Sequence, residues 1–450
     1  TNSTINSGSG ADTIRVGGTA VSAIADAGDG NDLISVSIAT GTSLQGNTGN
    51  DSIVIAGSAV GTTVGGGQGN DSITIGGNFQ GVINGGSGAD TLSVGGTVSG
   101  SSIDTGDAAD LVVFAAAASS SLQGNEANDT LIVLGAATSV TLGGGQGDDS
   151  ISIGGSMVAG QILSGSGADT ISVGGTVSGA NIDGADGNDL VVLAAATATT
   201  VTGSTGNDTL VISGAATSLI GSLGDGIDSV SIAGVMSVGS VLGGSGADTI
   251  AVAGGLQGGA SLFGGDSSLN SSDDANRISV GTGISGGGVY GDSNNDTLIV
   301  GGAITNATIN GAGNADSISV AGAASASAVI GGSGADSILI TGAVSGGSSV
   351  WGGASVPDSL DLADYISIGG AVSASTVHGA GGNDTVLIGG ALNGGLVDTG
   401  EDNDTLSVGD TLSAAFVQTG TGADSLRVTG AVTSSTIIGG STSNTSDDGA

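Results

Sequence analysis

Residues 85–96 read GGSGADTLSVGG, residues 165–175 read GSGADTISVGG, and residues 243–254 read GGSGADTIAVAG. The three stretches share the frame G-x-[GAN]-x-D-x-[ILV]-x-[ILVF], and their Asp residues are 79 positions apart. A frame that returns at a fixed spacing predicts a fold made of stacked, equivalent units. This frame therefore decides the fold class.

The frame occurs 21 times, and we call its Asp the anchor and each repeat a coil. Successive anchors are 19 or 20 residues apart, except for two spacings of 28. Asn276 takes the place of Asp in one coil. The other anchors are Asp12, Asp32, Asp51, Asp71, Asp90, Asp110, Asp129, Asp149, Asp169, Asp189, Asp208, Asp228, Asp248, Asp296, Asp316, Asp336, Asp364, Asp384, Asp404 and Asp424.

Each coil has the alternating pattern of short strands. The second and fourth residues after an anchor are apolar, as in Ile14 and Val16, and period two is typical of a strand. Another apolar residue, such as Leu44, follows about a dozen positions after each anchor. Glycines and β-branched residues oppose a helix. The sequence thus predicts an all-β parallel β-solenoid of about 21 coils, with two or three strands in each.

A longer period is superimposed on the coils. Anchors preceded by Gly-Ala return every fourth coil, which predicts superunits of four coils. The two spacings of 28 predict extended turn loops at 264–276 and 352–364, and residues 439–450 resemble the first of them. Because neither end has the polar cap that solenoids need, we expect residues 1–450 to be one continuous solenoid segment of a longer chain.

The composition excludes several classes of function. The chain has 41 acidic residues against three Arg and no Lys, so its formal charge of −38 would repel nucleic acid. With no Cys and one His, zinc and disulfide chemistry lack their ligands. The longest apolar run is 111–118, too short to span a membrane. Since 38% of residues are hydrophobic but only 2% aromatic, we expect a narrow aliphatic core.

The Gly-rich turns resemble those of RTX (repeats-in-toxin, haemolysin-type) calcium-binding proteins. Residues 85–93 read GGSGADTLS and match the nonapeptide GGxGxDxUx at each position, and 66–74 and 332–339 follow the same frame. This family includes secreted toxins, adhesins and bacterial S-layer proteins, so the resemblance implies export and Ca²⁺ bound at the turns. The match departs from the family because the motif returns every 19–20 residues rather than every 9, which implies calcium on one edge only.

Electrostatics supports a cation at the anchors independently. Stacking places anchor carboxylates about 5 Å apart, where two charges repel by about 3 kcal/mol at an effective dielectric near 20. Ca²⁺ accepts 6–8 oxygen ligands, which carboxylates and turn carbonyls can supply. All 20 Asp anchors are therefore candidate calcium ligands, and secondary acids lie in the same turns: Asp29, Asp107, Asp148, Asp186, Asp225, Asp292 and Asp402. The alternative is that each Asp only caps its turn by accepting backbone N–H groups.

Catalytic machinery has few candidate residues. His378 and Trp351 occupy equivalent positions before the Gly turn, as do Tyr290 and Phe263, and we interpret all four as ordinary solenoid positions. Every pair of carboxylates is a copy of every other pair, whereas acid–base catalysis needs distinct environments. We therefore expect a protein that is not an enzyme.

Some outward positions of the coils are apolar. The first and third residues after an anchor are usually Ser or Thr, but the second and third coils of each superunit place aliphatic residues there. These are Leu33, Val54, Leu111, Val113, Ile132, Leu190, Val192, Val211, Ile299 and Leu387. A patch that returns about every 19 Å favours a lateral self-assembly surface, although single surface aliphatics are also common.

Together these features predict an extracellular or cell-surface bacterial structural protein that binds calcium and forms homo-oligomers, as a surface layer, sheet or filament. One alternative is an adhesin stalk, and another is a calcium-dependent folding module of a secreted enzyme. An ice-binding solenoid needs an unbroken Thr array, whereas these outward positions mix Thr, Ser, Leu, Val and Arg.

Overall fold

The computed structural model describes residues 2–265, 274–353 and 361–440. It divides into two compact units, Thr1–Ser213 (unit 1) and Gly214–Ala450 (unit 2), and each is described by itself. No described segment forms a helix long and apolar enough to cross a membrane.

Unit 1 contains eleven anchors, Asp12 to Asp208, and each is followed directly by a strand. These first strands are β2 (Thr13–Val21), β4 (Leu33–Thr40), β6 (Ser52–Ile55), β8 (Ser72–Ile75), β10 (Thr91–Ser99), β12 (Leu111–Ala118), β14 (Thr130–Val133), β16 (Ser150–Ile153), β18 (Thr170–Ser178), β20 (Leu190–Thr197) and β22 (Thr209–Ile212). The strands that lead up to the anchors are β1 (Thr4–Asn6), β3 (Ile24–Asp29), β5 (Ser43–Thr48), β7 (Ala59–Gln68), β9 (Phe79–Ser87), β11 (Ser102–Asp107), β13 (Ser121–Glu126), β15 (Ala137–Gln146), β17 (Met157–Ser166), β19 (Asn181–Asp186) and β21 (Thr200–Thr205).

Unit 2 contains the remaining ten anchors, Asp228 to Asp424. Its first strands are β24 (Ser229–Ile232), β26 (Thr249–Val252), β29 (Arg277–Val280), β31 (Thr297–Val300), β33 (Ser317–Val320), β36 (Ser337–Ile340), β39 (Tyr365–Ile368), β42 (Thr385–Ile388), β45 (Thr405–Val408) and β48 (Ser425–Val428). Short second strands are β27 (Leu256–Gln257), β34 (Ala324–Ser325), β37 (Val344–Ser345), β40 (Val372–Ser373), β43 (Leu392–Asn393), β46 (Leu412–Ser413) and β49 (Val432–Thr433). The third strands are β23 (Ala216–Asp225), β25 (Met236–Ser245), β28 (Ser261–Phe263), β30 (Ile284–Asp292), β32 (Ile304–Gly313), β35 (Ala328–Ser333), β38 (Ser349–Trp351), β41 (Thr376–His378), β44 (Leu396–Asp398), β47 (Phe416–Gln418) and β50 (Thr436–Ile438).

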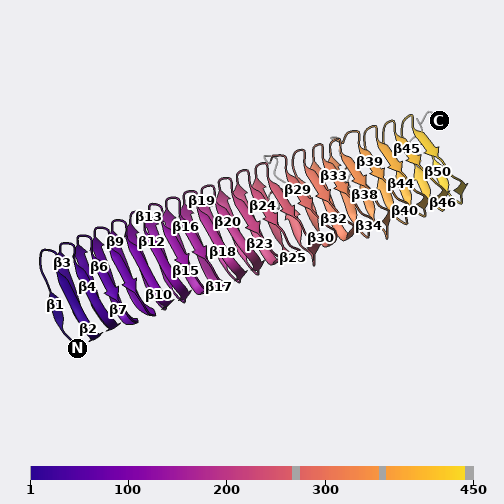
Figure 1. Cartoon of the computed structure of the whole chain (residues 1–450). Coiled ribbons are helices and arrows are strands. Elements are labelled where there is room, and N and C mark those ends of the chain that lie inside the picture. The colour runs from indigo at the N-terminus through magenta and orange to yellow at the C-terminus, as the bar shows by residue number, and fades with distance from the viewer. Residues whose placement is uncertain (1, 266–273, 354–360, 441–450) are drawn as a thin grey trace. The chain divides into compact units, whose positions relative to one another are not determined.

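Equivalent positions of successive coils are paired within each unit, and all these pairings are parallel (Figure 1). In unit 1, Ile34 pairs with Ile14 on one side and with Ile53 on the other. In unit 1 the second strand of a coil is not separate but forms part of a longer strand. For example, β7 begins beside the end of β4 and ends beside β5. The predicted parallel β-solenoid is confirmed, with three strand positions in each coil.

The core is narrow and mainly aliphatic, as expected. In the coil of Asp51, Ile53 and Ile55 from the first strand, Ala59 from the second and Val64 from the third are all fully buried. Residues at equivalent positions of successive coils then stack in columns, about 4.8 Å apart. No coil can bury these side chains alone, so each depends on the coils beside it.

Strand register continues across both long turns of unit 2. Thr249 pairs with Arg277 and Ser337 with Tyr365, although 28 residues separate each pair. The strand register is therefore unchanged across both spacings of 28. The central parts of both loops, with Asp266, Asp273 and Asp358, lie outside the described residues, and so does 441–450.

The different burial of two leucines, three residues apart, predicts how much each Leu→Ala substitution lowers the free energy of unfolding. Leu131 on β14 is fully buried, whereas Leu134, just beyond that strand, is 63% exposed. Leu131→Ala should lower the free energy of unfolding by about 2–5 kcal/mol, because it leaves a cavity in the core. Leu134→Ala should change it by less than about 0.5 kcal/mol. Chemical denaturation of the two variants checks this, and equal losses would contradict the assigned face of β14.

Candidate functional site

The anchors form a hydrogen-bonded ladder in each unit. From Asp32 to Asp208 and from Asp228 to Asp404, every anchor side chain is at most 5% exposed. The backbone N–H of one anchor donates to the Oδ1 atom of the next, as from Asp51 to Asp71 and from Asp129 to Asp149, both 2.7 Å. All the anchors predicted as calcium ligands therefore lie in one column within their unit. The Oδ1 atom of each anchor from Asp32 to Asp208 and from Asp248 to Asp424 accepts a backbone hydrogen bond.

In most coils the second carboxylate oxygen packs against a glycine five residues earlier in the same coil. A Cβ atom at Gly144 would lie 2.2 Å from Oδ2 of Asp149 and 2.5 Å from the carbonyl oxygen of Ser164 in the next coil. The Gly46 position meets Oδ2 of Asp51 and the carbonyl oxygen of Gly66 in the same way. This explains the glycine, because any side chain would fill the space into which both oxygens point.

Many of these Oδ2 atoms are buried without a hydrogen-bond partner among the described residues. They belong to Asp12, Asp32, Asp51, Asp71, Asp90, Asp129, Asp149, Asp189, Asp316, Asp336, Asp364 and Asp384. At Asp110, Asp169 and Asp404 a hydroxyl group of Thr105, Ser164 or Thr399 replaces the glycine and lowers the carboxyl pKa by hydrogen bonding. An unpartnered buried carboxylate is strongly destabilising. Each of these twelve carboxylates therefore needs a bound proton or a nearby cation.

Burial raises the pKa of many anchor carboxyl groups above the usual value of 3.8, from Asp51 to Asp189 in unit 1 and from Asp316 to Asp404 in unit 2. It raises the pKa of Asp149 to about 6, of Asp129 to about 7, and of Asp364 to about 9. The N–H group of the preceding anchor lowers each pKa, and the charges of neighbouring carboxylates raise it again. Around neutral pH the calcium-free ladder is therefore partly protonated.

Asn276 occupies its place in the ladder of unit 2 as an aspartate would. Its Oδ1 atom accepts the N–H of Asp248 at 2.8 Å, and its own N–H donates to Asp296 at 2.7 Å. Its Nδ2 atom lies where other anchors have Oδ2, next to Gly264. The ladder thus requires one acceptor oxygen in each coil and tolerates a neutral group.

A second, exposed ladder runs beside the first and was not predicted. The side-chain oxygen of the residue before an anchor accepts the N–H of the equivalent residue in the next coil, as between Asn50 and Asn70 at 2.8 Å. Asp148 plays the same part for Ala168, also at 2.8 Å. The signal in the sequence is the repeated Asn-Asp pair, whose Asn has the short side chain that this bond needs.

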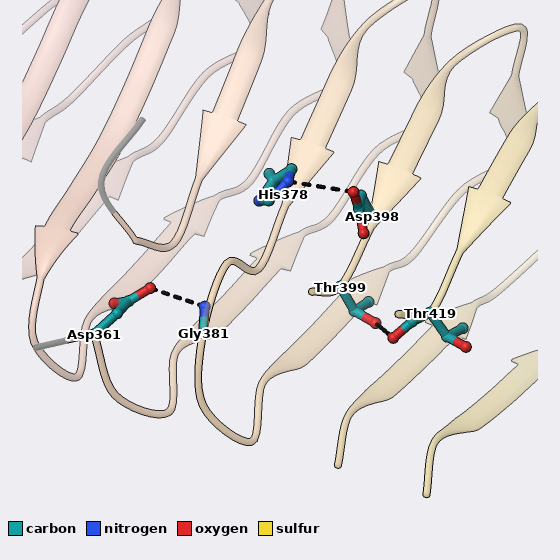
Figure 2. A network of polar contacts seen from close by, with 6 residues as sticks. All are labelled: Asp361, His378, Gly381, Asp398, Thr399 and Thr419. Atoms are coloured by element: carbon teal, nitrogen blue, oxygen red, sulfur yellow. Dashed lines mark hydrogen bonds and ion pairs between the residues drawn. The ribbon is translucent and has the colours of Figure 1, made fainter. Parts of the chain in front are cut away.

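The secondary acids do not form a continuous column. Hydroxyl groups of the next coil face two of them: Thr205 donates to Asp186 at 2.9 Å, and Ser245 donates to Asp225 at 2.7 Å. The other secondary acids, Asp29, Asp107, Asp148, Asp292 and Asp402, lie at the same turns, and all but the buried Asp292 are exposed. In the extended turn of unit 2, Oδ2 of Asp361 accepts the N–H of Gly381 at 2.9 Å (Figure 2).

The anchors fit a calcium ion in the chemistry of their donors. Carboxylate and carbonyl oxygens converge beside each glycine, and such hard donors suit Ca²⁺. Within the described ranges no three His, Cys, Asp or Glu side chains lie close enough together to hold a metal. Backbone carbonyl groups would therefore supply most of the ligands, with the anchor carboxylates supplying the charge.

Two pairs of rings in unit 2 stack between neighbouring coils. Phe263 and Tyr290 have ring centroids 4.8 Å apart, and Trp351 and His378 have theirs 4.5 Å apart. His378 Nε2 also lies 3.3 Å from Oδ2 of Asp398 on the next third strand (Figure 2). Strand register pairs Phe263 with Tyr290 and Trp351 with His378, which confirms their predicted equivalence.

The outward aliphatic residues of unit 1 gather in groups on the first strands. Val113 pairs in register with Ile132, and Val192 with Val211. Leu33, Leu111 and Leu190, each 36–38% exposed, lie in coils four apart. In unit 2, Ile299 and Leu387 lie on β31 and β42, and the 44% exposed Leu339 on β36 adds an outward position that was not predicted. The predicted placement of these side chains is confirmed.

Comparison with known proteins leaves the family open. No family model matches the chain, and no curated protein matches it. Among solved structures, the chain is similar to a hyperactive, Ca²⁺-dependent, β-helical antifreeze protein from an Antarctic bacterium, with 22% identity over 70% of this chain and 84% of that chain. The TM-score is 0.42, so neither the fold described above nor the function proposed below rests on this likeness.

The raised pKa values predict an unusual dependence of stability on pH. Because the folded anchors bind protons more tightly than unfolded ones, the free energy of unfolding should fall as pH rises from about 4 to about 9. In EGTA, Tm should be at least ~5 °C higher at about pH 5 than at about pH 8.5, since about 1 kcal/mol moves Tm by about 2–4 °C in a unit of this size. Thermal melts followed by circular dichroism test this, and a Tm that rises with pH would contradict it.

Proposed function

We propose that this chain is an extracellular structural protein, a calcium-stabilised β-solenoid that self-associates laterally into a layer, sheet or filament. The observation that carries the proposal is the ladder of buried anchor carboxylates, twelve of which have an unpartnered oxygen. A structural column of identical groups suits a scaffold better than a catalyst, because catalysis needs groups with distinct environments.

Calcium is the cation that the donors and the motif favour. Oxygen-only ligands select Ca²⁺ or Mg²⁺ over transition metals, and turn carbonyl groups adapt to the flexible geometry of Ca²⁺. The chain carries a formal charge of −38, so bound divalent cations would relieve repulsion along the whole ladder. The similarity of the turn motif to RTX proteins supports the same ion and an exported, bacterial origin.

Self-association is the second part of the proposal. The aliphatic groups of unit 1 return every four coils, and strands with apolar residues on both faces are usually covered on both. Weak contacts repeated on a rigid scaffold add up, because each contact after the first is effectively intramolecular. An adhesin stalk or a folding module of a secreted enzyme would share the calcium ladder but would have no need of the periodic outward groups.

Calcium removal tests the first part. Without metal at about pH 8.5, the charged anchor carboxylates of neighbouring coils repel one another. The Gly-rich chain also loses much conformational entropy on folding. In EGTA the chain should therefore have a weaker β signal by circular dichroism and a lower Tm, and both should rise on titration with Ca²⁺. An unchanged spectrum and Tm in EGTA would refute the calcium proposal.

Because Asn276 replaces Asp in the ladder without breaking it, Asp→Asn substitutions at other anchors test the role of the charge. Asp129→Asn and Asp149→Asn together keep the acceptor oxygens but remove two charges. At about pH 8.5 in EGTA this variant should melt higher than the parent chain, and the increase in Tm on adding Ca²⁺ should be smaller. The exposed pair Asp107→Asn and Asp186→Asn is the control and should leave the calcium-induced increase nearly unchanged. Equal effects of both pairs would place calcium away from the ladder.

Removal of the aliphatic groups tests the second part. A fourfold variant with Ser at Val113, Ile132, Val192 and Val211 should keep the calcium-induced β signal but no longer form sheets or filaments, as judged by electron microscopy. Each buried aliphatic side chain contributes up to about 1.5–3 kcal/mol. The control variant has Ser at Val60, Val82, Leu134 and Val158, which are exposed elsewhere in unit 1, and should assemble normally. Normal assembly of the first variant would favour the adhesin stalk.

A further inference from the structure

The outer face of the first strands carries no acidic residue in either unit. We call this face, made of the first and third residues after each anchor, the first-strand face. Unit 1 has 22 such positions, two in each of eleven coils, and unit 2 has 20, two in each of ten coils. None of them is Asp or Glu. At the chain's average of 41 acids in 450 residues, 42 positions would hold about four.

The only charges on this face are positive. Arg15 lies on it in unit 1, and Arg277 and Arg427 lie on it in unit 2, and these are all the Lys and Arg residues of the chain. The other residues on it are Ser, Thr, Ala, Tyr and aliphatic residues.

The third strands of unit 1 differ sharply in charge. Asp26 and Asp29 lie on β3, Asp104 and Asp107 on β11, and Asp183 and Asp186 on β19, with side chains that are half-buried or exposed. Acids are thus tolerated on the outside of the coils but are confined to the third strands and the turns. The first-strand face is therefore a sheet surface along which two chains of charge −38 can approach without opposing carboxylates. The second strands are also free of acids, but they lack the aliphatic groups that recur every four coils on the first-strand face.

The absence of acids has a direct energetic meaning for association. A carboxylate buried in a contact without a partner is strongly destabilising, and like charges placed opposite each other cost several kcal/mol. Hydroxyl groups can pair across a contact or keep bridging waters. The composition of this face therefore suits contact with a neutral surface of the same kind.

The spacing of the aliphatic groups indicates which partner covers the first-strand face. In unit 1 the groups around Leu33, Leu111 and Leu190 recur every four coils, about 19 Å apart. A partner that covers all of them must present apolar groups at the same spacing, and the same face of a second copy does so. Two identical patches meet in an isologous, two-fold contact, which is the commonest arrangement of homo-oligomers. Three Arg among 42 positions are too sparse to hold a polyanion, which is bound through many phosphate or similar contacts.

We propose that two copies of this chain pack with their first-strand faces against each other, so that the aliphatic groups of one copy cover those of its partner. The inference rests on the proposed self-association and names its contact. The acidic third strands then remain on the outside of the pair, where they stay hydrated.

Charge complementation tests this contact. One variant has Asp at Ser35, Thr74 and Ser152 on the first-strand face, and a second has Lys at the same positions. Each alone should lose Ca²⁺-dependent association in sedimentation velocity by at least tenfold, because like charges meet across the contact. An equimolar mixture should regain it, since Asp then faces Lys. A control with Asp at Thr63, Ser121 and Gln161, on the outside of third strands, should associate normally.

The outcomes separate the inference from the proposed function. If the Lys variant alone associates more strongly than the parent chain, the first-strand face meets an acidic face of the neighbour, and the inference falls while self-association stands. Binding of the Lys variant to dextran sulfate but not to itself or to the Asp variant would point to a polyanion instead. If the parent chain stays monomeric in Ca²⁺, both proposals fall. Variants that lose their calcium-induced β signal are replaced by single Asp and Lys variants at Ser152, judged by the same criteria.

Discussion

The hydrogen bond from the N–H of one anchor to the Oδ1 atom of the next connects every coil to its neighbour within each unit. It holds a carboxyl group in a place that water does not reach, at 1–5% exposure. Such a group is stable only if it is protonated, hydrogen-bonded or next to a cation. The stability of each unit is therefore tied to the pH and to the cations of its surroundings, because one oxygen of the carboxylate is satisfied by the backbone and the other points into the turn.

The same constraint explains the unusual composition. A Glu side chain would extend one methylene further and overfill the space beside Gly46 or Gly144, and 39 of the 41 acids are accordingly Asp. Asn276 fits because its amide has the same shape and one acceptor oxygen. Glycine lies five residues before most anchors and leaves space beside Oδ2, and Thr105 and Ser164 fit there because their hydroxyl groups bond to carbonyl oxygens of the next coil at 3.1 and 2.9 Å.

The coils of this highly acidic chain carry their exposed acids on some surfaces and not on others. The turns and third strands carry exposed acids, which stay hydrated. The first strands carry hydroxyl and aliphatic side chains on the outside and the main columns of Ile, Leu and Val on the inside. This separation follows from the 19–20-residue period, because a residue type repeated at one position of the coil becomes a continuous stripe in the folded unit.

The sequence by itself determined the parallel solenoid, the anchor column and the faces of the first strands, since a fixed period with alternating apolar residues allows one stacking register. It also placed Trp351 and His378 in equivalent positions. Only the tertiary structure decided what the two oxygens of an anchor do. Both the calcium-ligand and the turn-cap interpretations account for Asp at that position, and they differ by the direction in which Oδ2 points. The exposed Asn50–Asn70 bonds and the stacked rings of unit 2 likewise depend on contacts between coils, which are 20 or more residues apart in the sequence but about 5 Å apart once the strands pair.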